Sequence, residues 1–306
     1  MTKNIYCVNI KASLKDVFFI GDSMKILSLP SSIDEINKTK NLVDGFIIGI
    51  KDMCVNTNFC IEDLSILNEL TDKDIFISIN KNMHNGDLPR VESILLELNN
   101  YPIKGVLFYD IGVLNIYNRL KLNYDLVWAQ EHLTTNYNTI NYWYNHGSKY
   151  TLVSSDITYE EITEITKNSK SKLIVQLFGY LPMFVSKRHI VRNYLNQFNL
   201  SDMSNVNYMV KEGNTYPIID DNVGTHVYSS HILNGIGYAN RIDCEYILLN
   251  SFNIGTDNFI KVIEMFKNVN ESNSNEYEEK INNMFNNTNL GFLDTKTIYR
   301  VKKNEK

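Results

Sequence analysis

The side chains in this sequence that can carry out acid–base or anion-binding chemistry gather in a few polar stretches. Glu131 can act as a general acid or base, because a carboxyl group exchanges protons with a substrate held within hydrogen-bond reach. Lys187 and Arg188 form a basic pair that suits a carboxylate or phosphate, since a guanidinium makes two parallel hydrogen bonds to such groups. We predict Glu131, Lys187 and Arg188 as catalytic residues. The basic pair equally fits the solvated start of a helix, and that alternative stays open.

Histidines stand in the same stretches, and their side chains can transfer protons near neutral pH. They are His84, His132 and His189, and the alternative for each is a surface or supporting polar residue. The predicted substrate-binding residues are polar side chains in or near these stretches: Lys51, Asn80, His84, Gln130, Asn136, Gln176, Asp221 and His226.

Several hydrolase and nucleotide-binding motifs are absent from the sequence. It contains no HExxH, no GxSxG and no P-loop. A serine or cysteine hydrolase needs a nucleophile beside a base, and the local sequence nominates neither. Cys7, Cys54, Cys60 and Cys244 lack the spacing of a metal site. The separation of Cys54 from Cys60 also differs from a CxxC redox motif, so we expect structural thiols and no bound metal.

The elements that must position these residues are short apolar runs, each followed by a pattern typical of a helix. The runs cover residues 25–28, 45–50, 74–79, 105–109, 125–129, 150–154, 173–178 and 245–249, and such runs are typical of parallel strands buried on both faces. Helices are expected near 32–42, 61–71, 90–101, 112–121, 137–146, 159–168 and 257–268. This alternation predicts an α/β fold of the (β/α)8 TIM-barrel type. An open doubly wound sheet is the alternative, disfavoured because no GxGxxG follows the first strand.

In a barrel the carboxyl ends of the strands converge, so polar stretches that follow the strands should share one pocket. These stretches are 51–60, 80–85, 130–137 and 179–189. An insertion at about 193–230, between the seventh and eighth strands, has apolar alternation around acidic turns and predicts one or two β-hairpins. We divide the chain into a barrel domain, 1–270, and a small C-terminal extension, 271–306, with a short helix and strand-like alternation over 291–301.

Composition narrows the class of protein. Of the 306 residues 43% are hydrophobic, which excludes global disorder. The net charge of −5 argues against a generic nucleic-acid coat protein, whose phosphate contacts need a basic surface. The sequence has no apolar run typical of a signal peptide or transmembrane helix, so we expect a cytoplasmic protein without membrane association.

Four segments resemble peptidase family U32, the collagenase-like peptidases. The most specific is 178–188, FGYLPMFVSKR, which resembles the family's characteristic motif at the seventh strand. The supporting segments are 128–137, 216–226 and 291–301, and all four occur in the family's order. The sequence is most similar to the short Firmicutes-type branch, whose members occur beside a longer paralogue.

The resemblance implies a barrel-like fold and a role as a component of prephenate-dependent 5-hydroxylation of the tRNA wobble uridine, U34. It makes tRNA and the longer paralogue candidate partners and prephenate a candidate co-substrate, a dianion suited to Lys187 and Arg188. Two alternatives stay open: a U32 peptidase, as the family name says, and a non-catalytic subunit of a complex with the paralogue.

One departure from the family concerns iron–sulfur clusters. Members that hold a cluster carry cysteines in the strand-seven motif and downstream. This sequence has Pro182 and Ser186 in that motif and no cysteine between Cys60 and Cys244. We therefore expect no iron–sulfur cluster in this chain, which favours a component that works with a partner.

Overall fold

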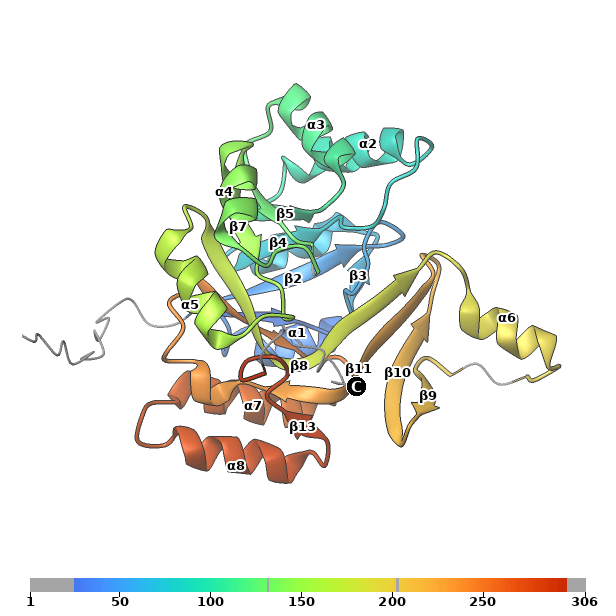
Figure 1. The fold of residues 1–306 in the computed structure, drawn as a ribbon. Coiled ribbons are helices and arrows are strands. Elements are labelled where there is room, and N and C mark those ends of the chain that lie inside the picture. The colour runs from blue at the N-terminus through green and yellow to red at the C-terminus, as the bar shows by residue number, and fades with distance from the viewer. Residues whose placement is uncertain (1–24, 131, 202–203, 296–306) are drawn as a thin grey trace, which may run out of the picture.

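The fold is a closed barrel of parallel strands (Figure 1). The computed structural model describes residues 25–130, 132–201 and 204–295. The barrel strands are β1 (Lys25–Leu29), β2 (Gly45–Ile50), β4 (Asp74–Ser78), β5 (Gly105–Phe108), β6 (Asp125–Trp128), β7 (Ser148–Leu152), β8 (Lys172–Ser186) and β12 (Tyr246–Asn250). The barrel closes because β12 pairs in parallel with β1 on one side and with β8 on the other. Every predicted run forms one of these strands, which confirms the barrel and shows that the open-sheet alternative is wrong.

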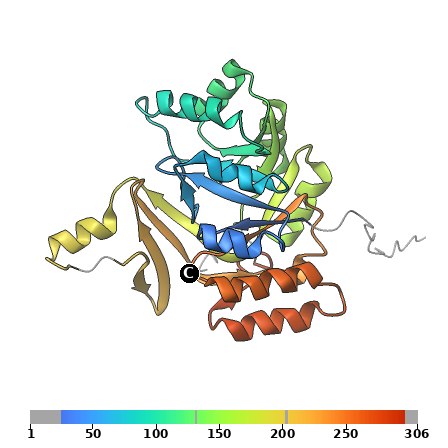
Figure 2. The same cartoon turned by 180° about the vertical axis from the view of Figure 1, so that it is seen from behind.

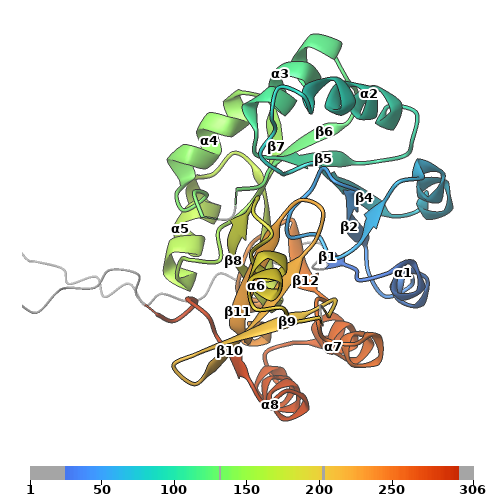
Figure 3. The same ribbon diagram turned by 90° about the vertical axis from the view of Figure 1, so that its right-hand side faces the viewer.

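Helices between the strands cover the outside of the barrel (Figures 2 and 3). They are α1 (Ile33–Thr39), α2 (Leu88–Leu98), α3 (Ile111–Leu120), α4 (Tyr137–Asn145), α5 (Tyr159–Asn168) and α7 (Thr256–Asn268). The helix predicted near 61–71 is a 3-10 helix, η1 (Leu64–Leu70), and it follows the short strand β3 (Cys60–Ile61). Within the described residues, no helix has both the length and the apolar character needed to cross a membrane.

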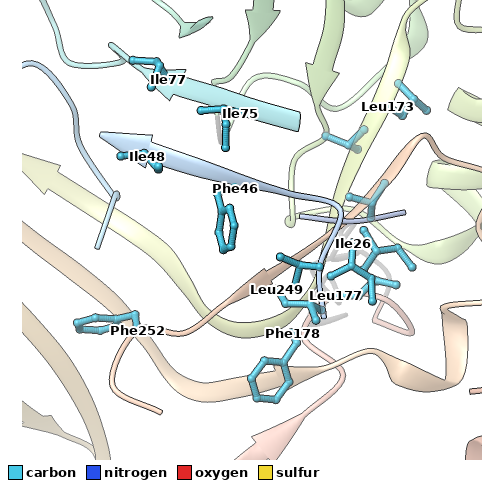
Figure 4. Close-up of a cluster of buried hydrophobic side chains, with 14 of the residues drawn as sticks. Ile26, Phe46, Ile48, Ile75, Ile77, Leu173, Leu177, Phe178, Leu249 and Phe252 are labelled. Atoms are coloured by element: carbon cyan, nitrogen blue, oxygen red, sulfur yellow. The ribbon is translucent and has the colours of Figure 1, made fainter. Parts of the chain in front are cut away.

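Two apolar layers form the core, one inside the barrel and one between the barrel and its helices. Phe46 and Ile48 belong to the outer layer (Figure 4). Ile47, between them in the strand, belongs to the inner layer. Successive side chains of a strand point to opposite faces, and here both faces are buried. This double burial explains why the strands are continuous apolar runs rather than alternating ones.

The strand β8 continues far beyond the barrel and begins an arm. Its first half pairs in parallel with β7 and β12, and its second half pairs antiparallel with β11 (Thr225–Asn234). The stretch 179–189 was predicted as a loop, and this prediction is wrong because residues 179–186 belong to β8. The sequence could not reveal this strand locally, since its pairing partners lie 39 to 56 residues further along the chain.

The arm, residues 182–201 and 204–228, includes most of the predicted insertion and projects from the barrel (Figure 1). The helix α6 (Ile190–Gln197) follows β8, and β9 (Asn207–Lys211), β10 (Asn214–Asp220) and β11 then form an antiparallel sheet. The predicted hairpins are therefore confirmed, while α6 was not anticipated. Asp220 fixes the corner before α6, because its buried carboxylate accepts hydrogen bonds from His189 Nδ1 at 2.8 Å and the Arg192 N–H at 3.1 Å.

After β12 and α7 the chain forms α8 (Ser274–Met284) and the two-residue strand β13 (Thr288–Asn289), which pairs with β11. A short 3-10 helix, η2 (Ile236–Tyr238), lies between β11 and β12. Strand-like alternation was expected over 291–301. Residues 291–295 instead form turns, and residues 296–301 lie outside the described part of the chain.

Ion pairs close the amino-terminal end of the barrel. The Glu245 carboxylate lies 3.3 Å from Lys25 Nζ and 3.0 Å from Lys172 Nζ. On the neighbouring side of this end, Asp74 contacts Lys104 Nζ at 2.7 Å. The conserved chemistry of barrel enzymes lies at the opposite end, so charges here serve stability.

These contacts lower the pKa of both carboxyl groups. Burial pushes the pKa of Glu245 upward, but hydrogen bonds from Lys172 and Lys25 outweigh it and hold the pKa below its ordinary value. For Asp74 burial also opposes the change, and hydrogen bonds from Lys104 and the Tyr246 hydroxyl outweigh it. Both groups therefore stabilise the fold in their charged form.

We expect Glu245→Gln to lower the free energy of unfolding at neutral pH by about 1 kcal/mol, because two lysines lose their carboxylate. Since the folded-state pKa lies below the ordinary 4.5, this stabilisation is present above that pH and disappears as the pH falls through the lowered pKa. Urea unfolding at about pH 7 and about pH 3 should show a smaller loss on acidification in the variant than in the wild type. Glu271→Gln, in an exposed segment, is the matched control; an equal effect of both substitutions would contradict a role for the network.

Candidate active site

A cavity opens at the carboxyl ends of the barrel strands, where the loops after the strands meet. Inward side chains of the strands form its apolar floor: Leu29, Ile47, Leu107, Leu152 and Leu248. Its polar lining comes from several strand ends and loops: Asn56, Thr57, Ser78, Asn80, His132, Ser155, Asp156, Gln176 and Asn250. This lining has no lysine or arginine among its described residues, so it offers amides, hydroxyls and an imidazole next to a carboxylate.

Two amide side chains in the cavity each keep one hydrogen-bonding group for a ligand. Asn80 Oδ1 accepts hydrogen bonds from the Val55 N–H and the Ser78 hydroxyl, both at 2.9 Å, while its Nδ2 donates to no described residue. Gln176 Nε2 donates to the backbone oxygen of Tyr180 at 3.1 Å, and its Oε1 accepts from none of the described side chains or N–H groups. Asn80 and Gln176 therefore present one amide donor and one amide acceptor to the cavity.

A second pair of amides fixes the mouth of the barrel. Asn58, in the loop after β2, donates through Nδ2 to Asn250 Oδ1 at 2.7 Å and to the Leu29 oxygen at 3.0 Å. Asn250 in turn donates a hydrogen bond through its Nδ2 to the Tyr180 backbone oxygen at 3.0 Å. These bonds join the β2 loop, β12 and β8, so both ends of the Asn250 amide serve structure.

An imidazole–carboxylate pair lies on the cavity wall. His132 Nδ1 is 3.0 Å from Asp156 Oδ2, and the two residues come from the loops after β6 and β7. Their side chains are about half exposed, at 46% and 45%. A carboxylate beside Nδ1 favours the tautomer with its hydrogen there, which leaves Nε2 able to accept a proton.

The predicted residues around His132 have supporting roles. Gln130 Oε1 accepts hydrogen bonds from the N–H groups of His132 and Leu133 at 2.9 and 2.6 Å, which holds the turn after β6. Asn136 begins α4, since its Oδ1 accepts a hydrogen bond from the Thr139 N–H at 2.9 Å. Glu131, the predicted acid or base, lies outside the described residues.

The predicted basic pair stands at the rim rather than in the cavity lining. Lys187 Nζ donates to the backbone oxygen of Asn82 at 2.6 Å, so the base of the arm touches the loop after β4. The Arg188 side chain is exposed, and its guanidinium makes no hydrogen bond or ion pair within the described part of the chain. Both cations can therefore meet a ligand only at the edge of the mouth.

Two further predicted residues also lie at the rim. Lys51 forms an ion pair with Glu62, which raises the pKa of its ammonium group. His84 is exposed, and its backbone N–H donates to Asp87 Oδ2 at 2.8 Å. That bond is the main cause of the lowered pKa of Asp87. Neither Lys51 nor His84 lines the cavity.

His226 and Asp221 connect the arm to the loop after β2. His226 is buried, its Nε2 lies 3.3 Å from Asp221 Oδ1, and its Nδ1 accepts a hydrogen bond from the Asn56 N–H at 3.3 Å. Burial pushes the pKa of Asp221 upward, but the hydrogen bond and charge of His226, together with the backbone N–H groups of Val223 and Gly224, hold the pKa below its ordinary value. The pair thus supports a cavity-lining loop from behind.

Of the predicted substrate-binding residues, the structure brings Asn80 and Gln176 together in the cavity. Sequence reasoning missed Asn58, Asp156 and Asn250. Asn250 directly follows the eighth predicted strand, and that place was a usable signal, but asparagine is too frequent in this sequence for its type to be informative. In the described ranges no three His, Cys, Asp or Glu side chains group as metal ligands do.

Comparison with known proteins assigns a family. The family model described as peptidase family U32 matches residues 51–296. The tRNA hydroxylation protein P2 of Bacillus subtilis (strain 168) is 27% identical over 182 residues. That match covers 56% of this chain and 59% of the relative, so this chain spans less than two thirds of the relative's length.

Solved structures with a similar arrangement include a U32 peptidase, with a TM-score of 0.48 and 9% identity over 75% of this chain and 93% of that one. Another is a tryptophan synthase complex of Pyrococcus furiosus, with a TM-score of 0.40 and 8% identity over 85% of this chain and 97% of that one.

Gly179 allows the close approach of β8 and β12 on which the mouth depends. Its φ is +102°, and a Cβ there would lie 2.8 Å from Asn250 Cβ and closer still to the Asn250 oxygen. We expect Gly179→Ala to lower the free energy of unfolding by about 2–4 kcal/mol, from the positive φ and the backbone clash together. Gly213→Ala is the control, because Gly213 has φ +80° with nothing within 4 Å, and should cost only about 1 kcal/mol. Urea unfolding measures both, and equal losses would contradict the steric argument.

Proposed function

Because the chain belongs to peptidase family U32, we propose that it is a component of the hydroxylation of uridine in tRNA, at C5 of the wobble position. The observation that carries the proposal is the pairing of a free amide donor on Asn80 with a free amide acceptor on Gln176, in one cavity with His132. The similarity to the relative named tRNA hydroxylation protein P2 supports a role in tRNA hydroxylation.

The two amide groups suit the polar edge of uracil. That edge carries an N–H between two carbonyl oxygens, so Asn80 Nδ2 can donate to a carbonyl while Gln176 Oε1 accepts from the N–H. An anticodon base is unpaired and can enter a pocket without the cost of opening a duplex. The lining holds the Asp156 carboxylate and no lysine or arginine among its described residues, so it fits an uncharged base better than a phosphate.

His132 is the group suited to proton transfer. Hydroxylation at C5 is a two-electron oxidation whose oxidant and oxygen must come from outside this chain. When the hydrogen on that carbon leaves as a proton, a base near the ring accepts it. The His132 Nε2 can take this role, with Asp156 orienting the ring. Asp156 is then a positioning residue.

We propose prephenate as the co-substrate and no iron–sulfur cluster in this chain. Prephenate carries two carboxylates, and Lys187 and Arg188 provide two cations at the rim of the cavity. Lys187 is held by a neutral carbonyl group and forms no direct ion pair with a described carboxylate, so its charge is available to an anion. The chemistry that supplies oxygen then belongs to the co-substrate or a partner.

The test is complementation of a strain that lacks this gene and any paralogue able to replace it. Mass spectrometry of tRNA nucleosides should show 5-hydroxyuridine derivatives restored by the wild type and reduced roughly tenfold or more with His132→Gln, the low end of the range for loss of a general base. His146→Gln, at the residue that follows the outer helix α4, is the matched control and should restore them fully. Unchanged derivatives in the deletion strain would remove the proposal.

Peptide hydrolysis, the activity in the family name, has less support in this site. A serine hydrolase needs a serine hydrogen-bonded to a histidine, and among the described residues Ser230 Oγ and His231 Nδ1 form such a bond at 2.8 Å. This pair lies outside the cavity lining, and no carboxylate of a described residue contacts the imidazole. Cleavage of gelatin by the purified protein, abolished by one cavity substitution, would favour hydrolysis instead.

The arm favours a second candidate role, that of a subunit bound to the longer paralogue. A series of large apolar side chains on the arm is exposed: Met183, Phe184, Ile190, Tyr194, Phe198, Leu200, Tyr208, Met209 and Val210. The helix α6 has no buried residue at all. Exposed apolar patches of this kind mark protein–protein contacts, and aromatic and methionine side chains are enriched there.

We expect the double substitution Tyr194→Ser and Phe198→Ser to reduce recovery of the longer paralogue with tagged protein by about tenfold, since aromatic anchors dominate interface energies. Native pull-down from cells measures this. Leu96→Ser with Ile111→Ser, which changes two exposed apolar residues on other helices, should leave recovery unchanged. If the wild type, the arm variant and the control variant recover equal amounts of the paralogue, the arm is not the surface to which the paralogue docks.

A further inference from the structure

Two cysteine sulfurs lie in contact beside the cavity. Cys54 Sγ is 3.1 Å from Cys60 Sγ, longer than the disulfide bond of about 2.05 Å, so the pair consists of two thiols. Cys54 lies in the loop between β2 and β3, and Cys60 is the first residue of β3, which pairs with β2 so that Cys60 lies next to Gly49. The sequence spacing favoured structural thiols, whereas strand pairing brings these sulfurs together.

Gly49 provides the space that the two sulfurs occupy. A Cβ at this position would lie 2.7 Å from Cys60 Sγ and closer still to Cys54 Sγ. The two sulfurs therefore pack against Gly49, and glycine is the one residue type without a side chain in the space that they occupy. Any side chain at this point of β2 would push the sulfurs apart or out of the loop.

The two thiols differ in accessibility. Cys54 is 4% exposed and donates a hydrogen bond to the Ile50 oxygen at 3.3 Å, whereas Cys60 is exposed. The pKa of Cys54 is raised by its hydrogen bond with Cys60 and by burial. An exposed thiol next to a buried one is the arrangement of an attacking and a resolving cysteine.

The loop between these cysteines carries part of the cavity wall. Val55, Asn56 and Thr57 line the cavity, and Asn56 donates its N–H to His226 of the arm. A bond between the sulfurs would close a ring around these three residues. Because the sulfurs must approach by about 1 Å to bond, the ring would shift this wall.

We propose that Cys54 and Cys60 form a reversible dithiol–disulfide site whose oxidant is a low-molecular-weight disulfide. The Cys60 thiolate attacks one sulfur of the oxidant, forms a mixed disulfide and releases the first small thiolate. Cys54 then gives its proton to that thiolate and attacks Cys60 Sγ, which releases the second small thiolate. The protein loses two electrons and two protons, and the oxidant gains them as two thiols. The site does not depend on the proposed function.

Cys244 gives an internal comparison in the same chain. It lies just before β12, and burial raises its pKa to about 12. A thiol with so little thiolate at neutral pH is a poor nucleophile. No sulfur of another described cysteine lies beside it, so it should stay reduced under conditions that oxidise Cys60.

The test exposes the reduced full-length protein to oxidised glutathione, traps free thiols by alkylation and maps the peptides by mass spectrometry. The wild type should give an internal Cys54–Cys60 disulfide, reversed by dithiothreitol, with Cys244 alkylated. Cys54→Ser should instead accumulate glutathione on Cys60 to a level about tenfold above the wild type, because the resolving thiol is gone. Cys60→Ser should leave Cys54 free of glutathione, since Cys54 is buried.

Gly49→Ala keeps both cysteines and separates geometry from thiol chemistry. It should slow ring closure about tenfold and so raise the mixed disulfide on Cys60, with near-ultraviolet circular dichroism verifying the fold. A wild type that holds glutathione on Cys60 to the same level as Cys54→Ser would overturn the proposal. So would a wild type in which neither cysteine reacts while the unfolded chain does.

Discussion

The structure depends on one hydrogen-bonded seam, the parallel pairing of β8 with β12. Without it the sheet has two free edges, and the polar strand ends lie along a line rather than around a mouth. The seam is irregular, since the register shifts between Leu248 and Leu249. Gly179 and Asn250 meet just beyond that shift, where a side-chain carbon on the glycine has no room. Closure and cavity are therefore consequences of the same contact.

The seam also determines where the arm begins. Inside the barrel β8 pairs in parallel with β12. Beyond the barrel β8 continues as a strand, because it pairs there with β11 in the antiparallel direction. The direction that β8 takes on leaving the barrel brings Lys187 against the loop after β4 and His226 against the loop after β2. Two of the loops around the mouth are thus held by the arm, so a partner bound to the arm could change the cavity wall without touching it.

The barrel was predictable because each of its strands is buried on both faces and is therefore a continuous apolar run in the sequence. Runs such as 45–50 and 74–79 are apolar throughout, and a strand with one wet face would alternate. The continuation of β8 was not predictable, since its ladder partner is remote in the chain and residues 179–189 contain no periodicity that distinguishes strand from loop. The helix α6 was not anticipated, although Ile190, Tyr194 and Phe198 recur at helical spacing. These side chains are exposed, so the stripe does not face the core.

The site was predictable in place but not in detail. Asn80 and Gln176 lie in or directly after predicted strands, and a closed barrel points such positions at one cavity. Sequence reasoning could not separate ligand-facing groups from structural ones of the same type. Asn136 and Asn80 are both asparagines after strands, yet one caps a helix and the other lines the cavity. The difference lies in backbone direction, which residue type does not encode.

The two ends of the barrel use charge in opposite ways, and this contrast limits what the cavity can bind. At the amino-terminal end, carboxylates such as Glu245 and Asp74 are matched by lysines, and each charge is neutralised within the protein. The carboxyl-terminal cavity has no lysine or arginine in its described lining, and its cations stand at the rim. A dianion deep in such a cavity would lose its hydration without gaining a partner. An uncharged ring inside and an anion at the rim, against Lys187, is the arrangement that avoids this cost.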